Sequence, residues 1–190
     1  MATSILVLDN YDSFTYNLVQ YLEELTEDKI TVKRNDAITV DAVAAFDKII
    51  LSPGPGLPKE SGILCDLIQT YASQKSILGI CLGHQAIAEV FGGELYNLPR
   101  VSHGQEVEME VLEPKNRLFE SIPQTFAGGL YHSWAVKEES LPEDFVPTVK
   151  SKTGILMGIS HTSHDLHGLQ FHPESVLTPA GKTILKNWLS

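Results

Sequence analysis

The chain has 190 residues, of which 43% are hydrophobic and 20% charged, and its formal net charge is -10. These proportions predict one globular domain, residues 1–190, large enough for a well-buried core. The acidic balance, without any cluster of Lys and Arg, argues against nucleic-acid binding. No apolar run approaches the roughly 20 residues of a membrane span, and residues 1–8 lack the features of a secretory signal. Two cysteines, Cys65 and Cys81, are too few for a disulfide framework, so a reducing, cytoplasmic location is expected.

Strand and helix patterns alternate in the first half of the chain. The predicted strands are residues 5–8, 30–34, 48–51 and 76–78, and the predicted helices are residues 13–25, 62–72 and 86–91. Asp12 or Ser13 is the expected N-cap of the first helix. This order predicts an α/β fold of three layers, with a mostly parallel central sheet and helices on both faces.

The second half has shorter apolar runs separated by turn residues. They predict strands at residues 106–112, 145–149, 155–160 and 166–171, which form a smaller antiparallel β region, and a closing helix at residues 180–189. Ligands of parallel sheets bind outside the carboxyl ends of the strands. Residues 9–13, residues 52–56 and Cys81 all follow strands, so we expect them at one rim, to which a hairpin would bring His172.

Residues 79–85, Gly-Ile-Cys-Leu-Gly-His-Gln, place a thiol on a glycine-flanked turn between a strand and a helix. This arrangement is typical of a nucleophile elbow, in which the side chain is held in a tight turn at the helix N-terminus. The helix dipole there favours the thiolate, which is the reactive form of cysteine. The alternative is that Cys81 is a small buried hydrophobic residue.

A cysteine nucleophile needs a base and a group that orients the base. Residues 171–174, Phe-His-Pro-Glu, offer His172 and Glu174 for these roles, with a stiff proline between them. Residues 52–56, Ser-Pro-Gly-Pro-Gly, offer the backbone N–H of Gly56, which with that of Leu82 could hold an oxyanion. The alternative for this loop is an ordinary surface turn.

Together with residues 8–17, Leu-Asp-Asn-Tyr-Asp-Ser-Phe-Thr-Tyr-Asn, these motifs resemble the class I (triad-type) glutamine amidotransferases from about residue 5 to the end. Within them the match is to the glutaminase subunits of anthranilate synthase and of aminodeoxychorismate (4-aminobenzoate) synthase. The resemblance implies a triad of Cys81, His172 and Glu174 that hydrolyses L-glutamine to glutamate and ammonia. It also implies a separate, chorismate-using partner subunit, which receives the ammonia; no cofactor is expected.

The resemblance also implies a set of glutamine contacts. They are Gly54, Pro55, Gly56, Gln85, Ser133 and Trp134. The amide of Gln85 can both donate and accept hydrogen bonds, which suits the polar end of a substrate. From its position alone, Gln85 could equally be an exposed residue in the first turn of a helix.

The remaining histidines are not expected to bind metal. His161, His164 and His167 lie three residues apart in a region of turn residues, without a cysteine, and are interpreted as solvated turn histidines. His84 and His132 are interpreted as structural residues or as residues that support the site from behind the substrate contacts.

One segment departs from the family pattern. Where relatives have Met-His-Gly-Lys, residues 102–105 read Ser-His-Gly-Gln, so an ion pair made by that lysine would be absent at Gln105. Three alternatives to a role in anthranilate synthase stay open: the same role in 4-aminobenzoate synthesis, a stand-alone cysteine hydrolase acting on γ-glutamyl substrates, and a binding module without activity.

Overall fold

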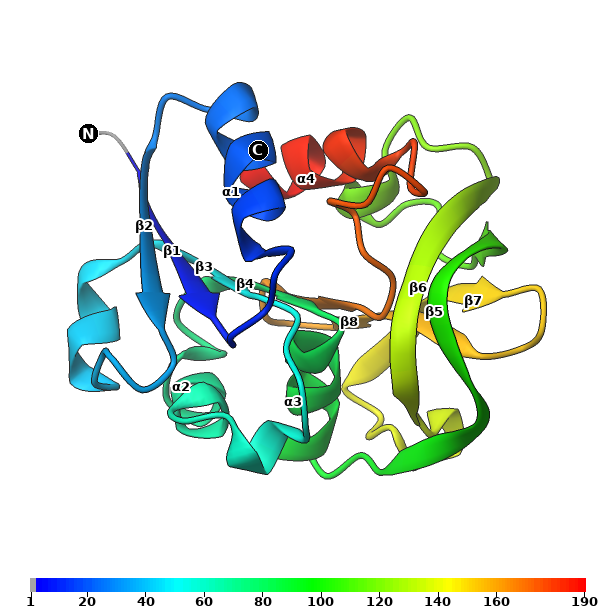
Figure 1. Ribbon diagram of the computed structural model, residues 1–190, viewed down its shortest axis with the longest axis horizontal. Helices are drawn as coiled ribbons and strands as arrows, with labels where there is room; N and C mark the ends of the chain where they lie inside the picture. Colours follow the sequence, from blue (N-terminus) through cyan, green and yellow to red (C-terminus); the bar gives the residue numbers. More distant parts are fainter. Residues whose placement is uncertain (1–2) are drawn as a thin grey trace.

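A computed structural model describes residues 3–190, so residues 1 and 2 of the predicted domain lie outside the described part (Figure 1). It contains one nine-stranded sheet with the order β2-β1-β3-β4-β9-β8-β7-β5-β6. The strands are β1 Ser4–Asp9, β2 Lys29–Arg34, β3 Lys48–Leu51, β4 Ser76–Ile80, β5 Leu95–Val111, β6 Thr125–Val136, β7 Phe145–Ser151, β8 Leu156–His161 and β9 Leu166–Leu169. The α-helices are α1 Thr15–Leu25, α2 Leu64–Tyr71, α3 Leu82–Val90 and α4 Gly181–Leu189, and the 3-10 helices are η1 Asp41–Ala45, η2 Pro58–Glu60, η3 Arg117–Phe119 and η4 Glu138–Ser140.

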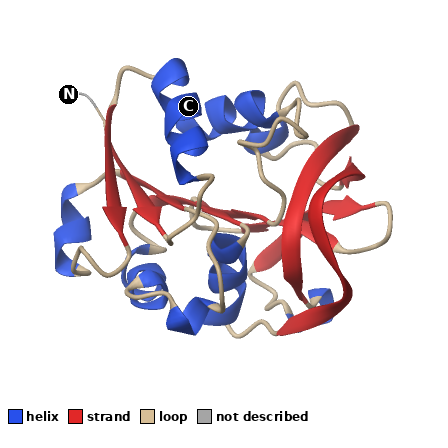
Figure 2. Cartoon of the chain, viewed as in Figure 1, coloured by secondary structure: helices blue, strands red, loops and turns tan. Residues whose placement is uncertain are grey.

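The parallel part of the sheet separates two hydrophobic cores. Strands β2, β1, β3, β4 and β9 run parallel, with α1 and α4 on one face and α2 and α3 on the other (Figures 1 and 2). Ile5 and Val7 of β1 pack with α1 and α4, whereas Leu6 and Leu8 pack with α2 and α3. Because successive strand residues point to opposite faces, a strand that is apolar throughout must be covered on both sides. The predicted α/β class with three layers is confirmed.

The antiparallel part continues the same sheet from β9 through β8, β7 and β5 to β6. The strand β6 is absent from the sequence-based prediction, and β5 begins at Leu95 rather than at residue 106. Two features concealed them. Gly128-Gly129 interrupts the apolar pattern of β6 and is typical of a turn, and most of β5 is exposed and therefore polar.

The start of α1 differs from the prediction. Phe14 occupies the N-cap position, so neither Asp12 nor Ser13 caps the helix. The Asp12 carboxylate instead accepts the N–H of Phe14 at 2.8 Å, which closes a turn just before the helix. An extra turn fits here because Tyr11 has a positive φ of 63°, a conformation that a local hydrogen bond from its N–H to Asp9 supports.

The strand β4 and the helix α3 meet at Cys81, and each extends closer to it than predicted. They pack so closely that a Cβ on Gly79 would lie 2.5 Å from the carbonyl oxygen of Gly83. The glycines on both sides of Cys81 therefore allow the helix to begin directly against the strand. Within residues 3–190 no helix is long and apolar enough to cross a membrane.

Candidate active site

The loops that follow β1 and β3 lie against each other at the carboxyl end of the sheet. The backbone N–H of Asn10 donates to Ser52 Oγ at 2.9 Å, and its side chain donates to the Ser52 carbonyl oxygen at 2.8 Å. A Cβ on Gly54 would lie 2.6 Å from Asn10 and 2.8 Å from the Leu82 side chain. The three segments predicted to share one rim are thus in direct contact, and a glycine is required where they meet.

Cys81 stands at the tip of a strained turn. Its backbone has φ 52° and ψ -99°, which residues other than glycine rarely adopt and which costs on the order of 1–3 kcal/mol. The conformation is held because its N–H donates to Leu169 at 2.7 Å and its carbonyl accepts from Gln85 at 3.0 Å. Leu82 is the first residue of α3, so its N–H lacks an acceptor within the helix.

His172 and Glu174 form a buried pair beside Cys81. His172 Nδ1 donates to Glu174 Oε1 at 2.7 Å, and both side chains are at most 2% exposed. The other ring nitrogen, Nε2, has no hydrogen-bond partner within residues 3–190, so it is the one available to exchange a proton. The rings of Phe14 and Tyr131 pack against His172, with centroids 5.7 and 4.9 Å away, and exclude water from it.

The turn that carries this pair is fastened to the unpredicted strand β6. The N–H of His172 donates to the Gly129 carbonyl at 3.0 Å. Thr178 Oγ1 bridges the two segments, because it donates to the His172 carbonyl at 2.7 Å and accepts from Gly129 at 2.9 Å. The position of His172 therefore depends on β6 as well as on β9.

Burial alone would lower the pKa of His172. The proximity of the side chains of Cys81 and Glu174 and their negative charges outweigh this effect and raise the pKa to about 10. The imidazole thus carries a proton at neutral pH.

A cavity of about 170 Å³ opens at Cys81. Its walls are Gly54, Pro55, Gly56, Cys81, Gln85, Tyr131, His132, Ser133 and Trp134. All six residues that the resemblance implied as glutamine contacts are among them. The cavity is smaller than the roughly 300–1,000 Å³ of pockets for drug-sized ligands, so it suits a ligand of amino-acid size.

A family model for class-I glutamine amidotransferases matches residues 6–190. The chain belongs to this family. It is 45% identical over 187 residues to the aminodeoxychorismate/anthranilate synthase component 2 of Bacillus subtilis (strain 168), and the match covers 97% of this chain and 95% of the relative. It is 43% identical over 189 residues to anthranilate synthase component 2 of Cyanophora paradoxa, with 98% of each chain covered.

The fold of this amidotransferase also matches a solved structure. A Thermoplasma acidophilum protein, provisionally named as part of a GMP synthase, superposes with a TM-score of 0.89 at 26% identity, over 100% of this chain and 93% of the other. The resemblance noted in the sequence is confirmed, as is the enzyme class.

Buried polar side chains are joined by hydrogen bonds at the amidotransferase cavity, and the sequence analysis did not select one of them, Gln170. Gln85 is buried, so the alternative of an exposed first-turn residue is wrong. Its Nε2 donates to the Trp134 carbonyl at 2.9 Å and to Gln170 Oε1 at 3.1 Å. His132, interpreted as a structural or supporting residue, lines the cavity, and its Nδ1 donates to the same Trp134 carbonyl at 2.7 Å. Gln170 lies two residues before His172, and proximity to that motif is the only signal that could have found it.

His161, His164 and His167 are not among the residues that line this cavity. His161 and His167 are buried in β8 and β9 rather than in a solvated turn, so that interpretation is wrong for both. His167 Nδ1 contacts Ser160 at 2.7 Å and its Nε2 contacts Asp165 at 2.9 Å, which explains how a polar ring is accommodated there. No group of metal-binding side chains occurs within residues 3–190.

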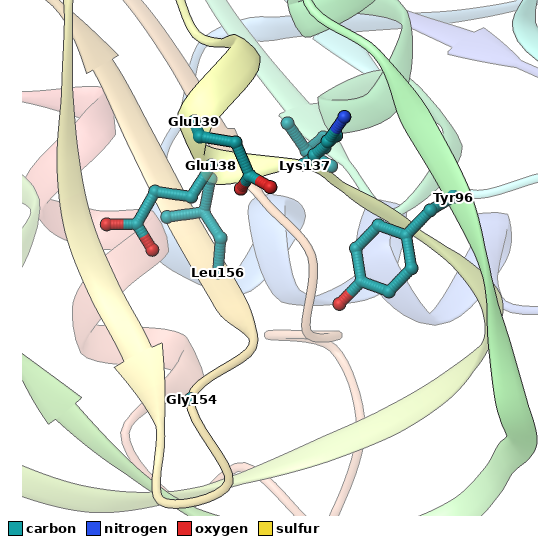
Figure 3. Close-up of a pocket in the computed structure, with 7 residues that line it drawn as sticks. Tyr96, Lys137, Glu138, Glu139, Gly154 and Leu156 are labelled. Atoms are coloured by element: carbon teal, nitrogen blue, oxygen red, sulfur yellow. The ribbon is translucent and has the colours of Figure 1, made fainter.

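A larger cavity, about 400 Å³, lies elsewhere, between β5, η4 and the turn before β8 (Figure 3). Its lining is Tyr96, Val136, Lys137, Glu138, Glu139, Gly154 and Leu156. Figure 3 shows Tyr96 on one side and the two glutamates on the other. This lining contains no cysteine, serine, threonine or histidine, so the smaller cavity at Cys81 is the candidate active site.

Proposed function

We propose that this chain is the glutamine-hydrolysing subunit of anthranilate synthase and that Cys81, His172 and Glu174 are its catalytic triad. The observation that carries the proposal is a strained thiol at a helix N-terminus, beside a buried imidazole that a carboxylate orients and next to a cavity of amino-acid size. These are the parts that nucleophilic attack on an amide requires.

In the first half of the reaction, the Cys81 sulfur attacks the side-chain amide carbon of glutamine. The amide nitrogen is too basic to leave as an anion, so it must be protonated, and the protonated His172 is the donor. The negative charge that develops on the amide oxygen is stabilised by the N–H groups of Gly56 and Leu82. The products of this half are ammonia and a glutamyl thioester on Cys81.

In the second half, the neutral imidazole of His172 takes a proton from water, and the resulting hydroxide attacks the thioester carbonyl. Glutamate leaves and the sulfur regains its initial state. Glu174 keeps Nδ1 protonated, so Nε2 is the nitrogen that exchanges protons in both halves.

The proposed glutamine contacts are of two kinds: the side-chain oxygen of Gln85, and the groups that line the rest of the cavity. Both hydrogens of the Gln85 amide are already donated within the protein, to Trp134 and Gln170, so only its Oε1 can meet a ligand. An acceptor of this kind suits the ammonium group of an amino acid. Ser133 and the backbone of Gly54, Pro55 and Gly56 line the rest of the cavity and complete the proposed recognition.

We propose a chorismate-using partner, and the names of the relatives, which are components of synthases, support it. Large apolar side chains around the site support a docked partner, because Tyr11, Tyr16 and Val176 are 49%, 67% and 87% exposed. They belong to the loop after β1, the first turn of α1 and the turn after Glu174, all at the rim. A reduced thiol is needed for this chemistry, and we accordingly place the protein in the cytoplasm.

The pathway has a second candidate. The Bacillus subtilis relative is named as a component of both aminodeoxychorismate synthase and anthranilate synthase. The second candidate is therefore that the chain described here serves 4-aminobenzoate synthesis as well. Purification of the native complex, followed by identification of the product formed from chorismate and glutamine, separates the two. Aminodeoxychorismate as the only product would contradict the anthranilate assignment and leave the glutaminase proposal intact.

Substitutions in the triad test the chemistry. We expect Cys81→Ala to abolish glutamate release from glutamine, because Cys81 is the one thiol among the residues that line the cavity. Glu174→Gln should lower kcat by roughly 10²–10⁴, since His172 loses its orienting carboxylate while the nucleophile remains. Glutamate release by the complex is the measurement.

The matched control supplies ammonium salt in place of glutamine. Both variant complexes should then form product at the wild-type rate, because only the glutamine site is damaged. A glutamine analogue that carries an electrophile should label Cys81 stoichiometrically in the unmodified chain. Glutamine-dependent turnover that survives Cys81→Ala, or an unlabelled Cys81, would refute the proposal.

A further inference from the structure

Gln170 is a fully buried amide whose side chain reaches the nucleophile. It follows the last residue of β9 and precedes the turn that carries His172. Its backbone N–H donates to the Met157 carbonyl of β8 at 2.9 Å, which keeps the residue in line with the sheet. Its side chain therefore starts from a rigid position next to Cys81.

The two ends of this side chain have different partners. Gln170 Nε2 donates to Cys81 Sγ at 3.5 Å, and Gln170 Oε1 accepts from Gln85 Nε2 at 3.1 Å. Gln85 Nε2 gives its other hydrogen to the Trp134 carbonyl at 2.9 Å. A reversed Gln170 amide would set its nitrogen against the nitrogen of Gln85, so the chain of bonds fixes the donor toward the sulfur.

We infer that Gln170 takes part in the reaction proposed above: its amide N–H stabilises the Cys81 thiolate, while its amide oxygen orients Gln85 toward the substrate. This inference rests on the proposed glutaminase function and adds a residue to it. A buried sulfur anion needs hydrogen-bond donors, because burial without them favours the neutral thiol. Gln170 supplies one donor, and Cys81 is itself the N-cap residue of α3, where the helix dipole favours an anion.

The same chain of bonds links the nucleophile to substrate recognition. Gln85 can offer the ligand its oxygen only because its nitrogen is engaged by Trp134 and Gln170. Loss of the Gln170 oxygen would free one hydrogen of Gln85 and allow its amide to rotate. A defect at Gln170 should therefore appear both in the reactivity of the thiol and in the KM for glutamine.

Two substitutions separate these effects. Gln170→Glu has the same shape, keeps an acceptor for Gln85 and places a carboxylate beside the sulfur instead of a donor. Gln170→Met removes both contacts. Thr148→Val is the matched control, because it also exchanges a buried polar group for an apolar one of similar size, on β7, which is two strands away from β9.

The measurement is the rate at which iodoacetamide alkylates Cys81 in the full chain, as a function of pH. We expect the midpoint to move upward by about one pH unit in Gln170→Met, a tenfold loss of thiolate at a fixed lower pH, and at least as far in Gln170→Glu. Thr148→Val should leave the profile unchanged. In the complex, KM for glutamine should rise in Gln170→Met and stay near the wild-type value in Gln170→Glu, whose defect should be in kcat.

Each outcome decides the inference. An unchanged alkylation profile in either folded variant overturns the role of Gln170, even if the wild-type complex hydrolyses glutamine. If Gln170→Met does not fold, the profile of Gln170→Glu still decides, because the shape of the side chain is kept. A wild-type Cys81 that does not react with iodoacetamide, in a complex that does not hydrolyse glutamine, would instead refute the proposed function itself.

Discussion

Two buried histidines near the sulfur-bearing turn end in opposite protonation states. His172 has a carboxylate and a thiol beside it, and its pKa is raised. His84, three residues after Cys81, is completely buried, and neither ring nitrogen has a hydrogen-bond partner in the described part of the chain. Burial, with a smaller effect of His132, lowers the pKa of His84 to about 3. His84 is therefore a neutral packing residue, although it belongs to the same sequence motif as Cys81.

This neutral state makes stability depend on pH. Unfolded histidine titrates near pH 6.5, so between about pH 6.5 and 3 the unfolded chain binds a proton that folded His84 does not. The free energy of unfolding therefore has its full value above about pH 6.5. Below that pH, His84 lowers it by about 1.4 kcal/mol for each pH unit, down to about pH 3. Between pH 7 and 5, the free energy of unfolding of the wild type should fall about 2 kcal/mol further than that of His84→Leu.

Urea unfolding at the two pH values measures this difference. His103→Gln is the control, because His103 is exposed, and its pH dependence should equal that of the wild type. Identical pH dependence in the wild type and His84→Leu would mean that His84 is protonated in the folded chain.

At the scale of elements, α4 fixes the turn that carries His172 and Glu174. Gly181, the first residue of α4, lies so close to this turn that a Cβ on it would be 1.8 Å from the Pro173 carbonyl oxygen. The helix is anchored in the core by Ile184, Leu185 and Trp188, all fully buried. The helix cannot withdraw easily, so the turn that carries His172 and Glu174 is the part that would have to move.

Gly181→Ala should therefore damage both stability and activity. The clash involves backbone atoms, and we expect it to lower the free energy of unfolding by on the order of 3 kcal/mol. Glutamine turnover in the complex should fall further than the unfolded fraction explains, because His172 is displaced from Cys81. Chemical denaturation and the glutamate assay measure the two effects.

Lys186→Ala is the control on the same helix, because Lys186 is exposed and an alanine fits there without a clash. It should match the wild type in both assays. Wild-type turnover in folded Gly181→Ala would show that α4 does not position the turn.

At the scale of the whole molecule, we expect the proposed partner to control when the site hydrolyses glutamine. Ammonia released into water is protonated and lost as a nucleophile, so hydrolysis is useful only when a closed path leads to the synthase partner. We expect glutamine hydrolysis by the isolated chain to be weak and to rise by about 5–150-fold when the synthase partner binds. Titration of the partner into a glutamate-release assay measures this coupling.

Gln105→Lys is the matched variant for this experiment. Gln105 is exposed in an irregular segment of β5, directly across from Leu130 of β6. Because a single exposed charge contributes at most about 1 kcal/mol, the dissociation constant of the complex should change by less than about fivefold. Full glutamine hydrolysis without any partner would contradict the coupling and would favour a stand-alone hydrolase.

The parallel half of the fold could be predicted because its signals are local. Apolar runs such as residues 48–51 mark strands that are covered on both faces, and the glycines around Cys81 mark a tight turn. The strand β6 could not be predicted, because the backbone of Gly128 and Gly129 is kept extended by neighbours distant in sequence: Gly129 donates to Thr178 and accepts from His172. The site residues contributed by β6 were placed by family resemblance rather than by pattern.

The sequence by itself determined the chemistry that is available: one thiol on a turn, an imidazole and a carboxylate separated by one proline, and a glycine-rich loop. Spacing and residue type suffice for this, because a turn and its reactive side chain are contiguous. Only the tertiary structure decided which polar groups meet the sulfur and which histidine keeps a proton. Those outcomes depend on burial and on contacts such as that between Gln170 and Cys81, which join residues 89 positions apart.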